Sequence, residues 1–129
     1  CRRIDERAGG AVLSRDIAYV PAGAWWCSPF ARWQGALAER HSLKLAAWGS
    51  ARAMARLGLD PAALDFGVLG FTVPQSGCFY GLPWVAAELG APQLPGPSVM
   101  QACATSARSL QLAAAEVAGG GAWVALVLA

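Results

Sequence analysis

The chain has 129 residues, of which 56% are hydrophobic and only 14% are charged, so it can form one domain with a real core and is not a disordered chain. Ten Lys and Arg residues against eight Asp and Glu residues leave a net charge of +2. The cations cluster only near the start, at Arg2, Arg3, Arg7 and Arg15, so we expect no nucleic-acid partner.

The first third of the chain shows little regular pattern. Residues 1–15 mix charged and small side chains and are interpreted as an irregular lead-in. Residues 17–20, Ile-Ala-Tyr-Val, form a short apolar run that predicts a strand buried on both faces. Residues 22–40 form a long loop, a kind of segment that is often functional in compact domains. We expect three tryptophans of this loop to pack in the core or at an interface: Trp25, Trp26 and Trp33.

A helix with clear boundary signals follows the loop. Ser42 is its expected N-cap, and Gly58 closes it. Asp60 then caps a second short turn, with Pro61 at the favoured first helical position. The apolar residues of the helix recur at helical spacing: Leu43, Ala47, Ala51 and Met54.

The remainder of the chain alternates apolar runs with helical segments. The expected strands are residues 66–71, residues 98–102 and a closing strand from Ala122, and the expected helices are residues 83–89 and 105–118. The glycines at 119–121 lack the strand-before, helix-after context of a phosphate loop and are interpreted as a helix stop. Wholly apolar strands that alternate with helices are typical of a largely parallel sheet covered on both faces. The sequence therefore predicts the α/β class.

No signal peptide or membrane span is expected. The start of the chain is charged, and the longest apolar run, residues 122–129, is too short to cross a bilayer. The chain lacks an initiating Met and stops inside that apolar run, so we expect a piece of a longer protein.

The cysteines form neither a metal motif nor a disulfide framework. Cys1, Cys27, Cys78 and Cys103 contain no C-x-x-C pair and no regular spacing, which argues against a zinc site and favours a reducing cytoplasm. We expect Cys27 and Cys78 to be packing or incidental residues.

Cys103 is the best candidate for chemistry. It stands in the segment Pro97-Ser98-Val99-Met100-Gln101-Ala102-Cys103-Ala104-Thr105-Ser106-Ala107, where an apolar run ends and a helical pattern begins. A thiol at that junction faces unpaired backbone N–H groups and the positive end of a helix, which favour the nucleophilic thiolate. Most cysteines are structural, so it is this position that singles out Cys103.

From about Asp16 to Ala129, the chain resembles the N-terminal part of thiolases. The resemblance is carried by Pro29-Phe30-x-Arg32-Trp33-x-Gly35-Ala36-Leu37-Ala38, by Gly58-Leu59-Asp60-Pro61, and by Cys103 at the opening of a helix. It implies a thiolase-like N-terminal domain over residues 16–129, truncated at its C-terminal end. In the complete family fold, a mostly parallel mixed sheet flanked by helices forms part of a layered αβαβα arrangement.

The resemblance also implies an activity. In thiolases the cysteine that matches Cys103 is acylated by an acyl-coenzyme A, and a second molecule then condenses with the acyl group or coenzyme A releases it. Coenzyme A thioester is a substrate here, so neither a separate cofactor nor a metal ion is expected. Thiolases commonly form dimers or tetramers, and the same is implied for this chain.

The rest of the thiolase machinery lies beyond this chain. The family takes its histidine bases, a second cysteine and most coenzyme A contacts from the C-terminal half, so we expect the isolated chain to be weakly active or inactive. His41, the sole histidine, is expected to be a solvated loop residue or a local hydrogen-bond partner. Arg32 is expected to be a solvated charge or part of a surface salt bridge.

The cysteine segment also departs from the common thiolase pattern. Met100 stands where many thiolases have Asn, and Ala104-Thr105-Ser106 stands where they have Gly-Ser-Gly. Residues 74–80 lack the Gln-Asn-Pro-x-Arg pattern, so a divergent thiolase is expected. Ala102-Cys103-Ala104-Thr105 is similar to the cysteine turn of β-ketoacyl synthases, which share the fold. Two alternatives stay open: a synthase-like condensing enzyme with an acyl carrier protein as donor, and a non-catalytic subunit that binds acyl-coenzyme A or a partner protein.

Overall fold

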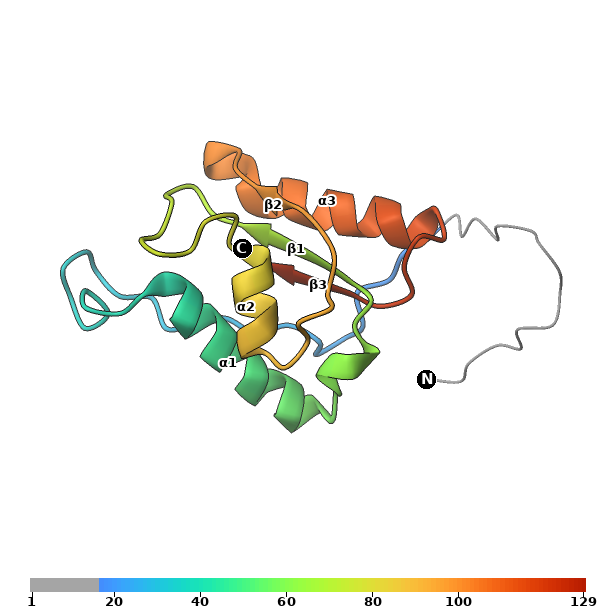
Figure 1. The fold of residues 1–129 in the computed structure, drawn as a ribbon, viewed down its shortest axis with the longest axis horizontal. Coiled ribbons are helices and arrows are strands. Elements are labelled where there is room, and N and C mark those ends of the chain that lie inside the picture. Colours follow the sequence, from blue (N-terminus) through green and yellow to red (C-terminus); the bar gives the residue numbers. More distant parts are fainter. Residues whose placement is uncertain (1–16) are drawn as a thin grey trace, which may run out of the picture.

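The computed structural model of the protein describes residues 17–129, so the expected lead-in at residues 1–15 and Asp16 lie outside the described residues. The three strands form a parallel sheet in the order β2–β1–β3, which confirms the α/β class (Figure 1). The elements in chain order are helix α1 (Ser42–Leu57), 3₁₀ turn η1 (Pro61–Ala63), strand β1 (Phe66–Gly70), helix α2 (Leu82–Glu88), strand β2 (Ser98–Val99), 3₁₀ turn η2 (Ala102–Ala104), helix α3 (Thr105–Ala118) and strand β3 (Ala125–Leu128).

Helices cover both faces of the sheet. Helix α3 packs against β1 and β3 on one face, α2 packs against β1 on the other, and α1 lies outside α2 (Figure 1). Central strand β1 is therefore buried from both sides, with Val68 0% and Leu69 2% exposed. A strand in this position must be apolar throughout, which explains why residues 66–70 show no alternating pattern.

The start of β3 is fixed by a carboxylate that precedes β1. Asp65 accepts hydrogen bonds from the backbone N–H groups of Trp123 and Val124, each with a shortest distance of 2.9 Å. The two strands then pair in register from Phe66 opposite Ala125 onward. One side chain thus ties together two segments that lie almost sixty residues apart.

The expected helix boundaries are confirmed to within one residue, and the helix expected at residues 83–89 spans Leu82–Glu88. His41, and not Ser42, occupies the N-cap position of α1, and its side chain makes no capping hydrogen bond. Gly58 ends the helix with φ +65°, a conformation that favours glycine. Asp60 caps η1 as expected, because its Oδ1 accepts from the N–H of Ala62 at 2.9 Å. The predicted helix at residues 105–118 coincides with α3.

The predicted strand at residues 17–20 is wrong. This segment forms no strand, and its side chains are exposed, Ile17 by 58% and Tyr19 by 80%. A strand forms only where a neighbouring edge supplies its hydrogen bonds, and none of the three described strands pairs with these residues. The predicted strand at residues 98–102 shortens to Ser98–Val99, and the closing strand begins at Ala125 and not at Ala122.

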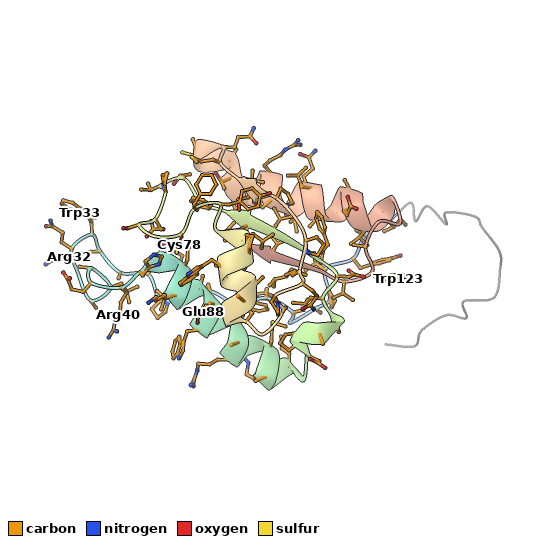
Figure 2. The ribbon with its side chains drawn as sticks, in the orientation of Figure 1. Arg32, Trp33, Arg40, Cys78, Glu88 and Trp123 are labelled. Atoms are coloured by element: carbon orange, nitrogen blue, oxygen red, sulfur yellow. The ribbon has the colours of Figure 1, made fainter. Side chains whose placement is uncertain are left out.

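The expected packing of the loop tryptophans holds for Trp26 alone. Trp26 packs against the core, and its indole N–H donates to Ser50 Oγ at 3.2 Å. Trp25 is 69% exposed, and Trp33 is 85% exposed on a loop that projects from the layered body (Figure 2). The rings of Trp25 and Trp33 therefore face mainly solvent.

None of the helices within residues 17–129 combines the length and the apolar composition needed to cross a bilayer.

Candidate functional site

Cys103 lies where the chain turns from the sheet into α3. Strand β2 ends at Val99, η2 spans Ala102–Ala104, and α3 begins at Thr105. The Cys103 side chain is exposed and its thiol is free. The expected position between a strand and a helix is confirmed, whereas the role of nucleophile stays a prediction.

The backbone immediately before Cys103 is strained. Ala102 has φ +47°, in the left-handed region that residues other than glycine seldom enter. Such conformations cost about 1–3 kcal/mol and are concentrated at functional sites. The turn is closed by the N–H of Ala104, which donates to Gln101 O at 3.0 Å, and by the N–H of Thr105, which donates to Ala102 O. Neither of these two bonds uses the Cys103 N–H.

Gly70, the last residue of β1, allows α3 to start close to the sheet. A Cβ at this position would lie 2.6 Å from Ser109 Oγ and 2.7 Å from Thr105 Cγ2. Real Cβ atoms do not approach other atoms so closely, because packed interiors leave no slack for an added methyl group. The absence of a side chain at Gly70 thus sets the distance between β1 and the turn that carries Cys103.

Replacing Gly70 by Ala should lower the free energy of unfolding by about 1–3 kcal/mol, because α3 must shift to relieve the overlap. Gly49 in α1 is the matched control, since a Cβ there would meet nothing within 4 Å. Gly49→Ala should raise stability by roughly 0.5–1 kcal/mol through the better helix propensity of alanine. Urea unfolding of both variants measures the difference, and an unchanged midpoint for Gly70→Ala would contradict the close packing.

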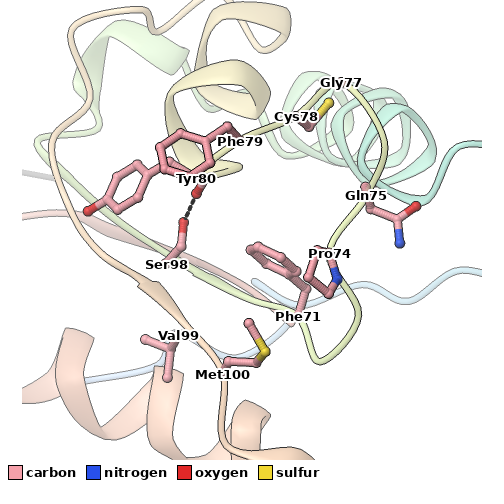
Figure 3. A pocket seen from close by; sticks show the side chains of 10 residues that line it. All are labelled: Phe71, Pro74, Gln75, Gly77, Cys78, Phe79, Tyr80, Ser98, Val99 and Met100. Atoms are coloured by element: carbon pink, nitrogen blue, oxygen red, sulfur yellow. Dashed lines mark hydrogen bonds between the residues drawn. The ribbon is translucent and has the colours of Figure 1, made fainter.

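A pocket of about 620 Å³ opens at the same end of the sheet (Figure 3). The carboxyl ends of parallel strands are the usual place for ligands in α/β folds. Met100 lines this pocket and lies three residues before Cys103 in the chain, whereas Cys103 itself is not among the lining residues. The lining is mainly apolar and consists of Phe71, Pro74, Gln75, Gly77, Cys78, Phe79, Tyr80, Ser98, Val99 and Met100.

Hydrogen bonds join the loop on one side of the pocket to β2 on the other. Ser98 Oγ donates to the carbonyl oxygen of Tyr80 (Figure 3) and accepts from the N–H of Leu82 at 3.3 Å. The Tyr80 hydroxyl donates to Gly96 O at 3.3 Å, and Tyr80 itself has φ +67°. These bonds fix the position of the loop that carries Tyr80 relative to β2.

His41 anchors the same loop to the start of α1. Its Nε2 lies 3.1 Å from Ser76 O and 3.5 Å from Cys78 Sγ, and its ring stacks on Trp84 with centroids 5.5 Å apart. A carbonyl can only accept, so Nε2 carries the proton, while Nδ1 is buried without a partner among the described residues. His41 is a hydrogen-bond partner as expected, but its partners are not local, because Ser76 lies 35 positions away along the chain. The contact with Cys78, 37 positions away, was not visible in the sequence.

Cys27 and Cys78 differ in their surroundings. Cys78 is 6% exposed and belongs to the hydrophobic core, which confirms its expected packing role. Cys27 is exposed, as Cys103 is, and both thiols are free. Exposure alone therefore does not distinguish Cys103; the turn around it does.

A second, shallower hollow of about 520 Å³ lies in the loop that precedes α1. Arg32 and Trp33 line it, and both side chains are exposed at the far end of the molecule from Trp123 (Figure 2). Arg32 forms no ion pair with another described residue, which agrees with the expected solvated charge. Within residues 17–129, no three His, Cys, Asp or Glu side chains gather as metal ligands would.

Comparisons with solved structures inform the fold. No protein-family model and no curated protein matches the chain. Among solved structures, the chain is similar to the priming β-ketosynthase from the R1128 polyketide biosynthetic pathway, with a TM-score of 0.58 and 28% sequence identity. The match covers 66% of this chain and 25% of that enzyme, so the chain spans about a quarter of its neighbour's length. The fold is thiolase-like, and the likeness supports the thiolase-like superfamily of condensing and acyl-transfer enzymes without singling out the thiolases themselves.

Proposed function

We propose that this chain is the cysteine-bearing part of a thiolase-type acyltransferase, which exchanges acyl groups with coenzyme A through a thioester on Cys103. The observation that carries the proposal is an exposed, free thiol on a strained turn between β2 and α3, three residues after Met100, which lines an apolar pocket. The buried Cys78 has no comparable access, and the exposed Cys27 has no such turn.

The reaction at this sulfur is a transfer between two thioesters. The Cys103 thiolate attacks the carbonyl carbon of the acyl-coenzyme A, a C–S bond forms, and the original C–S bond breaks to release coenzyme A as its thiolate. In this proposal the Cys103 N–H, which takes no part in closing the turn, donates to the oxygen that becomes negative during the attack. We propose that another part of the complete protein supplies the base that takes the proton of the cysteine, because the sole histidine of this sequence is held on Ser76, Cys78 and Trp84.

The apolar pocket suits the hydrocarbon part of an acyl group. Phe71, Val99 and Met100 form part of its wall, and burial of each methylene contributes about 0.8 kcal/mol. A volume of about 620 Å³ exceeds the need of an acetyl group, so we propose that the site accepts longer acyl chains as well as acetyl.

Filling the pocket at Met100 should therefore change the preference for acyl length. We expect Met100→Trp to slow the acylation of Cys103 by hexanoyl-coenzyme A about tenfold or more, and acylation by acetyl-coenzyme A much less. Initial rates of adduct formation with the two thioesters measure this ratio. Equal slowing of both rates would place the acyl chain elsewhere.

A β-ketosynthase that receives its acyl group from a carrier protein is the second candidate. It is favoured by the match to a β-ketosynthase and by the likeness of Ala102-Cys103-Ala104-Thr105 to the cysteine turn of that group. A third candidate is a thiolase-like subunit that binds acyl-coenzyme A or a partner without catalysis.

Mass spectrometry of the complete protein distinguishes these functions. Incubation with acetyl-coenzyme A should add one acetyl group, found on the peptide that contains Cys103. An adduct that forms only from an acyl carrier protein would favour the synthase, and no adduct from either donor would favour the non-catalytic subunit.

A further inference from the structure

The left-handed conformation of Ala102 must be stabilised by its surroundings, because a methyl-bearing residue at φ +47° is disfavoured on its own. Helix α3 has no side-chain cap at its N-cap residue, Ala104. The residue that holds the turn must therefore lie elsewhere, and the hydrogen bonds point to Thr105.

The Thr105 hydroxyl bridges the peptide group that precedes Gln101 and the peptide group that follows Ala102. Its Oγ1 accepts from the backbone N–H of Gln101 at 2.9 Å and donates to the carbonyl oxygen of Ala102 at 2.7 Å. A hydroxyl has a single hydrogen, so the donation to Ala102 O leaves its lone pairs for Gln101, and both directions are fixed. The bond to Ala102 O restrains the peptide plane that follows Ala102, and together the two bonds fix the chain across Gln101 and Ala102. The peptide plane that precedes Ala102 is held by the N–H of Ala104, which donates to Gln101 O.

Packing holds the Thr105 side chain itself in place. Thr105 is only 6% exposed, and its Cγ2 methyl group lies against Gly70, where a Cβ would approach to 2.7 Å. The methyl group therefore faces β1 while the hydroxyl faces the turn. A β-branched side chain confined in this way has one usable χ1 rotamer. The hydroxyl therefore points to the turn without a further loss of side-chain conformational entropy.

We propose that Thr105 is a positioning residue for Cys103: its hydroxyl bridge keeps Ala102 left-handed and thereby sets the direction of the Cys103 thiol and N–H. Thr105 acts through the backbone and does not touch the reacting atoms. The inference rests on the proposed function only in taking Cys103 as the reactive cysteine.

Three variants of the complete protein test the role of the bridge. Thr105→Val keeps the shape but removes the hydroxyl, Thr105→Ser keeps the hydroxyl, and Ser109→Ala is the matched control. Ser109 is fully buried one turn further along α3, and its hydroxyl donates to Thr105 O at 2.8 Å without contacting the cysteine turn. The control therefore removes a buried hydroxyl from the same helix.

Two rates are read for each variant, the acylation of Cys103 by acetyl-coenzyme A and its alkylation by iodoacetamide. Chymotrypsin cleaves after Phe79 and Tyr80, so Cys78 and Cys103 fall in different peptides for mass spectrometry. We expect Thr105→Val to slow the acylation of Cys103 at least about tenfold relative to Ser109→Ala and to change its alkylation rate, while Thr105→Ser stays within about twofold of the unaltered protein.

The outcomes separate this inference from the proposed function. Equal acylation and alkylation rates for Thr105→Val and Ser109→Ala would overturn the positioning role. If the unaltered protein forms no acyl adduct, the proposed function is wrong. The alkylation rates alone then still decide whether the Thr105 hydroxyl sets the direction of the Cys103 thiol. If Thr105→Val does not fold, failure of Thr105→Ser to keep the rates of the unaltered protein would overturn the inference.

Discussion

Cys103→Ser should abolish acyl transfer, with a loss of at least about a thousandfold in the rate of acyl-enzyme formation. A serine hydroxyl is a far weaker nucleophile than a thiolate at neutral pH, and the described residues place no base beside it that would activate it. Removing a nucleophile typically costs several powers of ten in rate. The acyl adduct is counted by mass spectrometry, and turnover is followed by the release of free coenzyme A.

Cys27→Ser is the matched control for this experiment. Cys27 and Cys103 are both exposed and both free, so the two substitutions remove equally accessible thiols. We expect Cys27→Ser to keep the full acyl adduct and the full rate. An adduct that persists in Cys103→Ser but disappears in Cys27→Ser would move the chemistry to the loop before α1.

Gly96→Ala should cause the largest loss of stability, about 3 kcal/mol or more. Gly96 has φ +143°, and a Cβ there would lie 1.7 Å from the carbonyl oxygen of Gly67 in β1. The flanking carbonyl groups of Pro95 and Pro97 accept hydrogen bonds from β1 at 2.8 and 3.1 Å, so neither backbone can move away without breaking the pairing. The clash is with main chain and not with the flexible end of a side chain.

Gly90→Ala measures the part of this loss that comes from conformation alone. Gly90 also has a positive φ, +83°, but a Cβ there would meet nothing within 4 Å. We expect it to cost about 1–2 kcal/mol, the usual penalty of the left-handed region. Urea unfolding curves give the free energy of unfolding of both variants. Similar losses of stability for Gly96→Ala and Gly90→Ala would contradict a steric clash at Gly96.

Local signals account for the elements that were predicted correctly. The boundaries of α3 followed from an alanine-rich helical run stopped by glycines at 119–121, and the end of α1 followed from Gly58. These features act within a few residues of where they stand, so a sequence is sufficient to find them. The place of Cys103 between a strand and a helix was predictable for the same reason.

The errors arose where distant segments decide the outcome. Residues 17–20 have the composition of a strand, but pairing requires a neighbouring edge that no local pattern reveals. Likewise, the contact between His41 and Cys78 joins positions 37 apart. The strain at Ala102 and its relief by Thr105 depend on the close approach of α3 to Gly70, a tertiary contact, so the positioning role was not foreseeable either.

Strand β3 lies at the rim of the three-stranded sheet and pairs with β1 alone among the described strands. Its four residues, Ala-Leu-Val-Leu, are apolar, and no charge or proline among them discourages main-chain bonding to another molecule. Such rims template intermolecular β-association when chains are concentrated. Solutions of the chain on its own should therefore grow turbid with rising concentration, and attaching a short lysine-bearing strand after Ala129 is a direct way to keep them clear.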